Sequence, residues 1–114
     1  MAKKAIWISY DLGIKGDFPG LYAWLDNNDA KEAGNSIAFL NYEFNGTDAK
    51  LLSILKKDLE KNVTFKPGDR IYVVRMRLDK GIQKISGKFI IGNRRASPWE
   101  GYGQKDTDIT DGDE

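Results

Sequence analysis

The chain of 114 residues contains no cysteine and no histidine. Without cysteine there is no disulfide, no thiolate zinc site and no cysteine nucleophile, so packing alone has to stabilise the fold. Without histidine, the usual general base near neutral pH and the commonest metal ligand are both missing. Any catalysis would therefore depend on carboxylates, lysine, tyrosine, serine or a metal held by carboxylates.

Long apolar runs are also missing from the sequence. No segment approaches the roughly 20 apolar residues that a membrane helix needs, and residues 1–5 lead into a strand pattern without the apolar region of a signal peptide. We therefore expect a cytoplasmic protein without membrane contact. Apolar residues make up 40% and charged residues 31% of the chain, an ordinary globular balance, and the length suits one domain.

The charges are distributed unevenly although their sum is only +1. Residues 62–105 carry 10 basic and 3 acidic groups, whereas residues 106–114 carry 5 acidic groups and no basic one. Such asymmetry indicates an anionic partner or an internal electrostatic contact. We predict one domain over residues 1–104 and an acidic disordered tail over residues 105–114. This tail either competes with anionic partners for the basic segment or only keeps the protein soluble.

Apolar periodicity predicts four strands and two helices, in the order strand, helix, strand, helix, strand, strand. We place the strands at residues 5–12, 36–44, 70–78 and about 84–91. The first helix begins near Pro19 with Asp17 as its cap and ends between residues 27 and 34. The second has residue 47 or 48 as its cap and ends near residue 62, with Leu51, Leu52, Leu55 and Leu59 on its apolar face.

This order of elements favours an α+β fold of ferredoxin-like type. We predict a two-layer sandwich of order βαβαββ, with a mostly antiparallel four-stranded sheet and two helices on one face. By alternation, the opposite face would carry Trp7, Ser9, Asp11, Ile37, Phe39, Asn41, Glu43, Ile71, Val73, Arg75 and Arg77. Because this face is too apolar to stay uncovered, we expect a homodimer or another cover, such as the C-terminal segment.

A basic C-terminal hairpin is the main candidate for binding an anionic partner. Its cations are Arg70, Arg75, Arg77, Lys80, Lys84, Lys88, Arg94 and Arg95, of which all but Arg70 and Lys80 are taken as the candidate binding residues. They would follow a phosphate backbone, or they would protect a solvated strand edge against pairing. Aromatic residues beside arginines on the uncovered face would stack on the bases of single-stranded nucleic acid, or they would pack in an interface. The glycine-and-aromatic signature of RNA-recognition modules is absent from residues 70–78.

Two further groups of residues are candidates for binding a partner, a ligand or a metal ion. Trp99 and Tyr102 lie among chain-breaking residues and are expected to pack against the body or a second subunit, or to line a ligand pocket. Asp11 and Glu43 end two strands and would hold Mg²⁺ or Mn²⁺ if they converged. The alternative is that Asp11 caps its loop and Glu43 pairs with Arg75 or Arg77.

The run Ile8-Ser9-Tyr10-Asp11-Leu12 ends a first strand that is followed by a helix. In this it resembles the small CRISPR-associated adaptation subunit and its VapD-like relatives. The resemblance implies a ferredoxin-like homodimer with a sheet-mediated interface. It also implies a metal-dependent nuclease role that maps here only onto Asp11. The run covers about a tenth of the chain, and the Trp99 and Tyr102 segment has no counterpart in that family.

The sequence therefore favours a non-catalytic homodimeric module that binds nucleic acid or an acidic partner through its basic hairpin, without a cofactor. A metal-dependent phosphodiesterase or nuclease that uses Asp11 is the first alternative. A regulatory protein that binds one protein partner through Trp99 and Tyr102 is the second.

Overall fold

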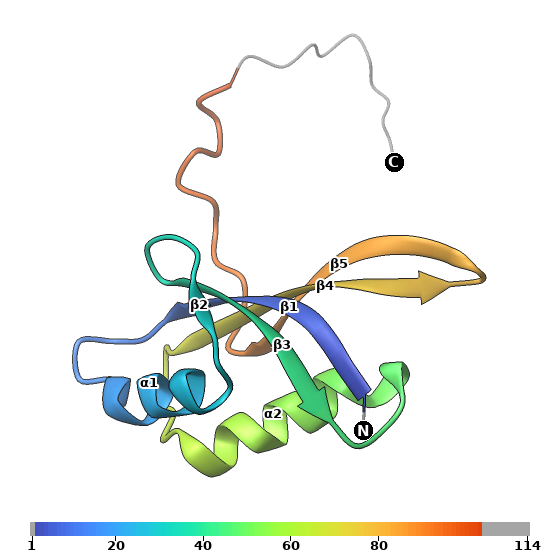
Figure 1. Ribbon diagram of the computed structural model, residues 1–114. Helices are drawn as coiled ribbons and strands as arrows, with labels where there is room; N and C mark the ends of the chain where they lie inside the picture. The colour runs from blue at the N-terminus through green and yellow to red at the C-terminus, as the bar shows by residue number, and fades with distance from the viewer. Residues whose placement is uncertain (1, 104–114) are drawn as a thin grey trace, which may run out of the picture.

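The computed structural model describes residues 2–103 of the chain. A five-stranded, fully antiparallel sheet has the strand order β2-β3-β1-β4-β5, and both α-helices cover the same face of it (Figure 1). The elements are β1 (Ala2–Asp11), α1 (Phe18–Asn27), β2 (Lys31–Glu32), β3 (Ile37–Phe44), the 3₁₀-helix η1 (Asp48–Lys50), α2 (Leu51–Asn62), β4 (Arg70–Asp79) and β5 (Ile82–Ile91).

The predicted four-stranded, ferredoxin-like order is wrong. The sequence pattern missed β2, which has only two residues, both of them polar and exposed. After α1 ends, β2 pairs with β3 through a turn in which Gly34 and Ser36 have positive φ. This extra reversal makes β3 run antiparallel to β1, its neighbour in the sheet. Short polar strands of this kind have no periodicity for a sequence to reveal.

The hydrophobic core lies between the helices and the covered face of the sheet. Ile6 and Ile8 of β1 are fully buried, as are the three leucines of α2 at four-residue spacing: Leu51, Leu55 and Leu59. The alternation predicted for β1 and β3 places the correct residues inward, because Ala38, Leu40, Tyr42 and Phe44 are buried too. Burial of this apolar surface is the main stabilising contribution in a fold without disulfides.

Asp17 joins the start of α1 to the segment after α2. One carboxylate oxygen accepts a hydrogen bond from the backbone N–H of Gly20, so Asp17 caps α1 as predicted. The other oxygen accepts a hydrogen bond from the backbone N–H of Thr64 at 2.8 Å. These two hydrogen bonds, that of Thr64 first, hold the pKa of Asp17 below its usual value.

Asp58 of α2 ties the two helices to the sheet. Its Oδ2 accepts hydrogen bonds from the indole N–H of Trp24 at 3.1 Å and from the phenol of Tyr42 at 2.9 Å. Burial, and then the hydrogen bond to Asp58, raise the pKa of Tyr42 well above its usual value. Both aromatic side chains thus fill the core while their polar atoms remain paired.

The side chains of β4 alternate in the opposite sense to the one predicted. Ile71 and Val73 are buried against the helices, so Tyr72, Val74 and Met76 lie on the uncovered face. Arg75 lies on the helix side, opposite the core residue Ile6 in the register of β1 and β4. One set of β4 side chains, Ile71, Val73, Arg75, Arg77 and Asp79, has two apolar members, and the other, Arg70, Tyr72, Val74, Met76 and Leu78, has four. Apolar content therefore favoured the set that faces away from the helices.

The β4 and β5 hairpin extends beyond the rest of the sheet (Figure 1). Pairing of β4 with β1 ends at Arg75, so residues 76–79 pair only with residues 82–85. We call this two-stranded projection the arm. After β5 the chain leaves on the side of the sheet opposite the helices (Figure 1). Over residues 2–103, no helix is long and apolar enough to cross a membrane.

Candidate nucleic-acid interface

Four aromatic side chains lie on the uncovered face of four neighbouring strands: Trp7, Phe39, Tyr72 and Phe89. The rings of Trp7 and Phe39 are 4.9 Å apart between centroids, and those of Tyr72 and Phe89 are 4.7 Å apart. Trp7 is opposite Val74, two residues from Tyr72, so the two pairs are diagonal neighbours. We call these four rings the aromatic platform. Trp7 is 45% exposed and the other three are partly exposed.

Two arginines lie on the second ring pair of the platform. The guanidinium of Arg94 is 5.4 Å from the centroid of Tyr72 and 5.3 Å from that of Phe89, and Arg70 is 5.5 Å from Phe89. These distances are within the range of cation–π attraction. The rings and guanidinium groups line a pocket of about 240 Å³ together with Ser9 and Asp11.

Asp11 is paired rather than free, and it is distant from Glu43. Its Oδ2 accepts hydrogen bonds from Nη2 of Arg70 at 2.7 Å and from Nε at 3.0 Å, while Nη1 of Arg95 is 3.9 Å away. Glu43 is opposite Lys3 at the other end of β1, about 26 Å away at 3.3 Å per strand residue. The two carboxylates therefore do not converge on a shared cation. Within residues 2–103, no cluster of three or more acidic side chains is placed to hold a metal ion.

The basic residues predicted to act together are divided between the two sides of the sheet. Arg94 and Arg95 adjoin the uncovered face, whereas Arg77 and Lys84 are opposite each other on the helix side of the arm. Lys88 lies on that side as well, opposite the core residue Val73. Like charges that face each other across a strand pair repel, and Asp79 offsets this repulsion by pairing with Lys84 at 3.0 Å.

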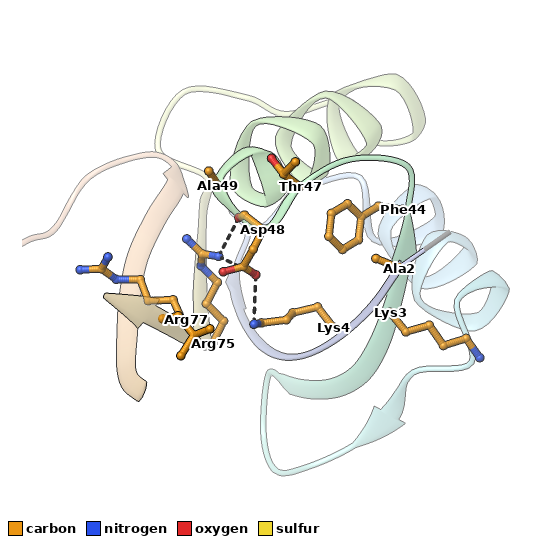
Figure 2. Close-up of a pocket in the computed structure, with 10 residues that line it drawn as sticks. Ala2, Lys3, Lys4, Phe44, Thr47, Asp48, Ala49, Arg75 and Arg77 are labelled. Atoms are coloured by element: carbon orange, nitrogen blue, oxygen red, sulfur yellow. Dashed lines mark hydrogen bonds and ion pairs between the residues drawn. The ribbon is translucent and has the colours of Figure 1, made fainter. Parts of the chain in front are cut away.

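Arg75 is a structural contact at the base of the arm. Its Nη1 donates to the backbone carbonyl of Asp48 at 3.1 Å and lies 3.5 Å from the carboxylate, which also pairs with Lys4 at 3.0 Å (Figure 2). These residues line a pocket of about 600 Å³ between the arm, the start of β1 and η1. Because the Arg75 side chain is only 11% exposed, it is not presented to a partner. Arg77 extends away from Asp48 (Figure 2).

Trp99 and Tyr102 do not pack against the body of the domain. Trp99 is 72% and Tyr102 88% exposed, and a backbone hydrogen bond joins them in one turn. Neither residue is among the linings of the pockets described above. The acidic tail predicted over residues 105–114 lies outside the described residues.

The sequence pattern named Arg70 among the hairpin cations but missed Tyr72 and Phe89 as members of the site. Tyr72 was assigned to the core because the facing of β4 was predicted in the wrong sense. The arginines at positions 75 and 77 gave no signal against that facing, because guanidinium groups also lie beside aromatic rings on the uncovered face, as those of Arg70 and Arg94 do. Comparisons with protein-family models, with curated proteins and with solved structures gave no match for this chain.

Proposed function

We propose that this protein is a non-catalytic module that binds single-stranded nucleic acid on the uncovered face of its sheet. The observation that carries the proposal is the position of Arg94 over the rings of Tyr72 and Phe89. Rings on which bases stack, beside guanidinium groups that take phosphates, are the combination that single-strand binders use. Trp7 and Phe39 extend the stacking surface across β1 and β3.

The cations near the platform supply the electrostatic part of binding. Arg95 is 61% exposed at its side chain and Arg94 is exposed as well, so both are accessible to phosphates that flank a stacked base. Arg77, Lys84 and Lys88 on the reverse side of β4 and β5 add attraction at longer range without touching the bases. A solvent-exposed arrangement of this kind predicts binding that weakens as salt rises.

The metal-dependent nuclease has less support. Asp11 is the residue onto which that role maps, and its Oδ2 already accepts two hydrogen bonds from Arg70. Its expected carboxylate partner, Glu43, is at the other end of β1.

Fluorescence anisotropy with a labelled decathymidine strand tests the proposal. The wild type should bind at low salt, and Phe89→Ala should weaken binding roughly 5- to 150-fold, because stacking contributes about 1–3 kcal/mol per base. Replacing Arg94 and Arg95 together with alanine should lower the salt slope by about 1.4, since each phosphate contact contributes about 0.7 on a single strand. The exposed pair Lys56 and Lys57 of α2, replaced in the same way, is the matched charge control.

Two results would overturn the proposal. One is the absence of any anisotropy change at low salt with DNA or RNA strands. The other is equal loss of affinity in the Arg94 and Arg95 variant and in the Lys56 and Lys57 variant, because this would mean that total charge, not the platform, holds the strand.

Self-association is a second candidate function, favoured by the apolar side chains of the arm. Leu78, Ile82 and Ile85 are between 62% and 75% exposed, and Met76 is opposite Ile85. Exposed apolar groups gathered on a projection are typical of a protein contact, and a second copy of the chain is the partner we propose. Sedimentation equilibrium should give a dimer for the wild type and a monomer for Leu78→Ser with Ile85→Ser. A monomeric wild type at high protein concentration would refute this candidate.

A further inference from the structure

The pocket beside Arg94 has a polar wall as well as aromatic rings. Its lining consists of Ser9, Asp11, Arg70, Tyr72, Phe89 and Arg94, and its volume is about 240 Å³. A flat aromatic ligand is the kind of group that stacks on Tyr72, Phe89 or the guanidinium plane of Arg94. The remaining groups, a carboxylate, a hydroxyl and two guanidinium groups, determine which ligand is preferred.

Asp11 has one carboxylate oxygen available to a ligand. Both of its hydrogen bonds from Arg70 and its approach to Arg95 involve Oδ2. Among the interactions of residues 2–103, none involves Oδ1, and the Asp11 side chain is 50% exposed. An ionised carboxylate only accepts hydrogen bonds. This wall therefore favours a ligand edge that presents N–H donors and disfavours one that presents oxygen or nitrogen acceptors.

The guanidinium groups have the opposite requirement. Arg70 directs its Nε and Nη2 at Asp11, and Arg94 makes one long contact of 3.5 Å to the phenol of Tyr72. The remaining N–H groups of both guanidinium groups can donate hydrogen bonds to a ligand but cannot accept any. The pocket as a whole thus combines an acceptor wall with donors beside it, above aromatic rings.

Guanine is the base whose edges match this arrangement. It presents two adjacent donors, N1–H and the N2 amino group, next to the acceptors O6 and N7, which arginine recognises well. Adenine, cytosine and uracil each present fewer donors toward a carboxylate. We infer that this pocket binds a guanine base, which donates to Asp11, accepts from Arg94 and stacks on the rings of Tyr72 and Phe89. This inference rests on the proposed function, because the base belongs to a bound single strand.

Anisotropy with four decamers tests the inference. Each decamer is a thymidine host with one central guanine, hypoxanthine, adenine or thymine, which avoids the self-association of guanine runs. The full wild-type chain should bind the guanine strand about tenfold more tightly than the all-thymidine strand, in keeping with the discrimination typical of a bidentate base contact. Hypoxanthine lacks the N2 amino group and should lose part of that preference.

The variant Asp11→Asn tests whether the preference for guanine comes from the pocket that Asp11 lines. This variant replaces one acceptor with an amide donor, so the ratio of its affinities for the guanine and thymidine decamers should fall to about one. The lost negative charge should raise the affinity for all four decamers by a similar factor, so the ratio is the quantity to compare. Glu43→Gln removes the same charge from the uncovered face at the other end of β1 and should keep the preference for guanine. Thermal unfolding of both variants verifies that they are folded.

The outcomes separate the inference from the proposed function. Equal binding of all four decamers by the wild type overturns the guanine inference and leaves single-strand binding in place. Absence of binding to any decamer overturns both. A guanine preference that persists in Asp11→Asn overturns the assignment to this pocket. Free guanosine monophosphate that binds as tightly as the guanine decamer keeps the pocket assignment but replaces the strand with a mononucleotide.

Discussion

Gly87 of β5 lies directly against the phenol ring of Tyr72, so closely that a Cβ at this position would overlap the ring and its hydroxyl. The φ of Gly87 is not in the left-handed region, so the requirement for glycine here comes from the ring and not from the backbone. Gly87 thereby permits Tyr72 to lie across β5 beside Phe89, where Arg94 covers both rings.

We predict that Gly87→Ala displaces Tyr72 and damages the aromatic platform. The clashing atoms are the outer end of a partly exposed ring, which can move aside, so the loss of folding free energy should lie at the low end of overpacking, about 1 kcal/mol. The affinity for decathymidine should fall because the ring leaves its place beside Phe89. Gly13→Ala is the matched control, because an added Cβ there meets only an ordinary contact at 3.8 Å. Urea unfolding and anisotropy measure the two effects. Wild-type affinity in Gly87→Ala would show that the ring of Tyr72 has no part in binding.

The features that the sequence predicted well are those set by local periodicity and capping. Leu51, Leu55 and Leu59 repeat every four residues, and all three are fully buried in α2, which ends at residue 62 as predicted. Asp17 caps α1 because the chemistry of a helix start is local.

The sequence pattern of β4 could not predict which of its side chains face the helices. The more apolar side of the strand faces away from the helices, because long-range contacts decide the facing: Ile71 and Val73 join the core, and Arg75 contacts Asp48. The wrong facing of β4 affected the prediction of the candidate site most, because Tyr72 and Phe89 come into contact only when β4 and β5 are placed in register.

Loss of the Asp58 carboxylate should destabilise the fold. In Asp58→Ala, the indole N–H of Trp24 and the phenol of Tyr42 would remain buried without their acceptor. Each such donor costs about 1–3 kcal/mol, so the midpoint of urea unfolding should fall clearly. Glu60→Ala, at an exposed position of the same helix, should change it little. If the two variants unfold at the same urea concentration, the Asp58 hydrogen bonds do not stabilise the domain.

The stability of the domain should depend on Asp17 at acid pH. The folded chain holds the pKa of Asp17 below its value of 3.8 in the unfolded chain, so the folded state binds fewer protons and is favoured above that pH. This stabilisation is lost as the pH falls through the lowered pKa. Asp17→Asn should thus be less stable than the wild type at pH 7, and the difference should shrink toward pH 2. Urea midpoints at several pH values measure it, with Asp26→Asn as the control for charge. A difference that does not change with pH would contradict the assignment.

Alkaline pH should destabilise the domain through Tyr42. Burial, and then the hydrogen bond to Asp58, keep its pKa above the ordinary value of 10.0, which applies in the unfolded chain. Above pH 10 the unfolded state therefore releases a proton that the folded state retains, and stability falls as pH rises. Tyr42→Phe should have a shallower decline over this range than the wild type. Parallel declines for the two proteins would indicate that Tyr42 ionises normally in the folded state.

The arm should lose its fixed position when Asp48 is removed. The Asp48 carboxylate lies 3.5 Å from Nη1 of Arg75, the last β4 residue that pairs with β1, and it pairs with Lys4 at 3.0 Å. Asp48→Ala removes these two ion pairs and leaves the hydrogen bond from Arg75 to the backbone carbonyl of residue 48. Because Asp48 is 42% exposed, solvent screening limits the global loss from Asp48→Ala to about 1–2 kcal/mol. The larger effect should be local, since the strands beyond Arg75 are held only by each other. Hydrogen exchange should accelerate in residues 76–79 and 82–85 while the amides of β1 keep their protection. Asp79→Ala is the control, because it removes a carboxylate within the arm itself. If the arm is anchored at its base, its amides should exchange more slowly in Asp79→Ala than in Asp48→Ala. Faster exchange in Asp79→Ala would refute anchoring by Asp48.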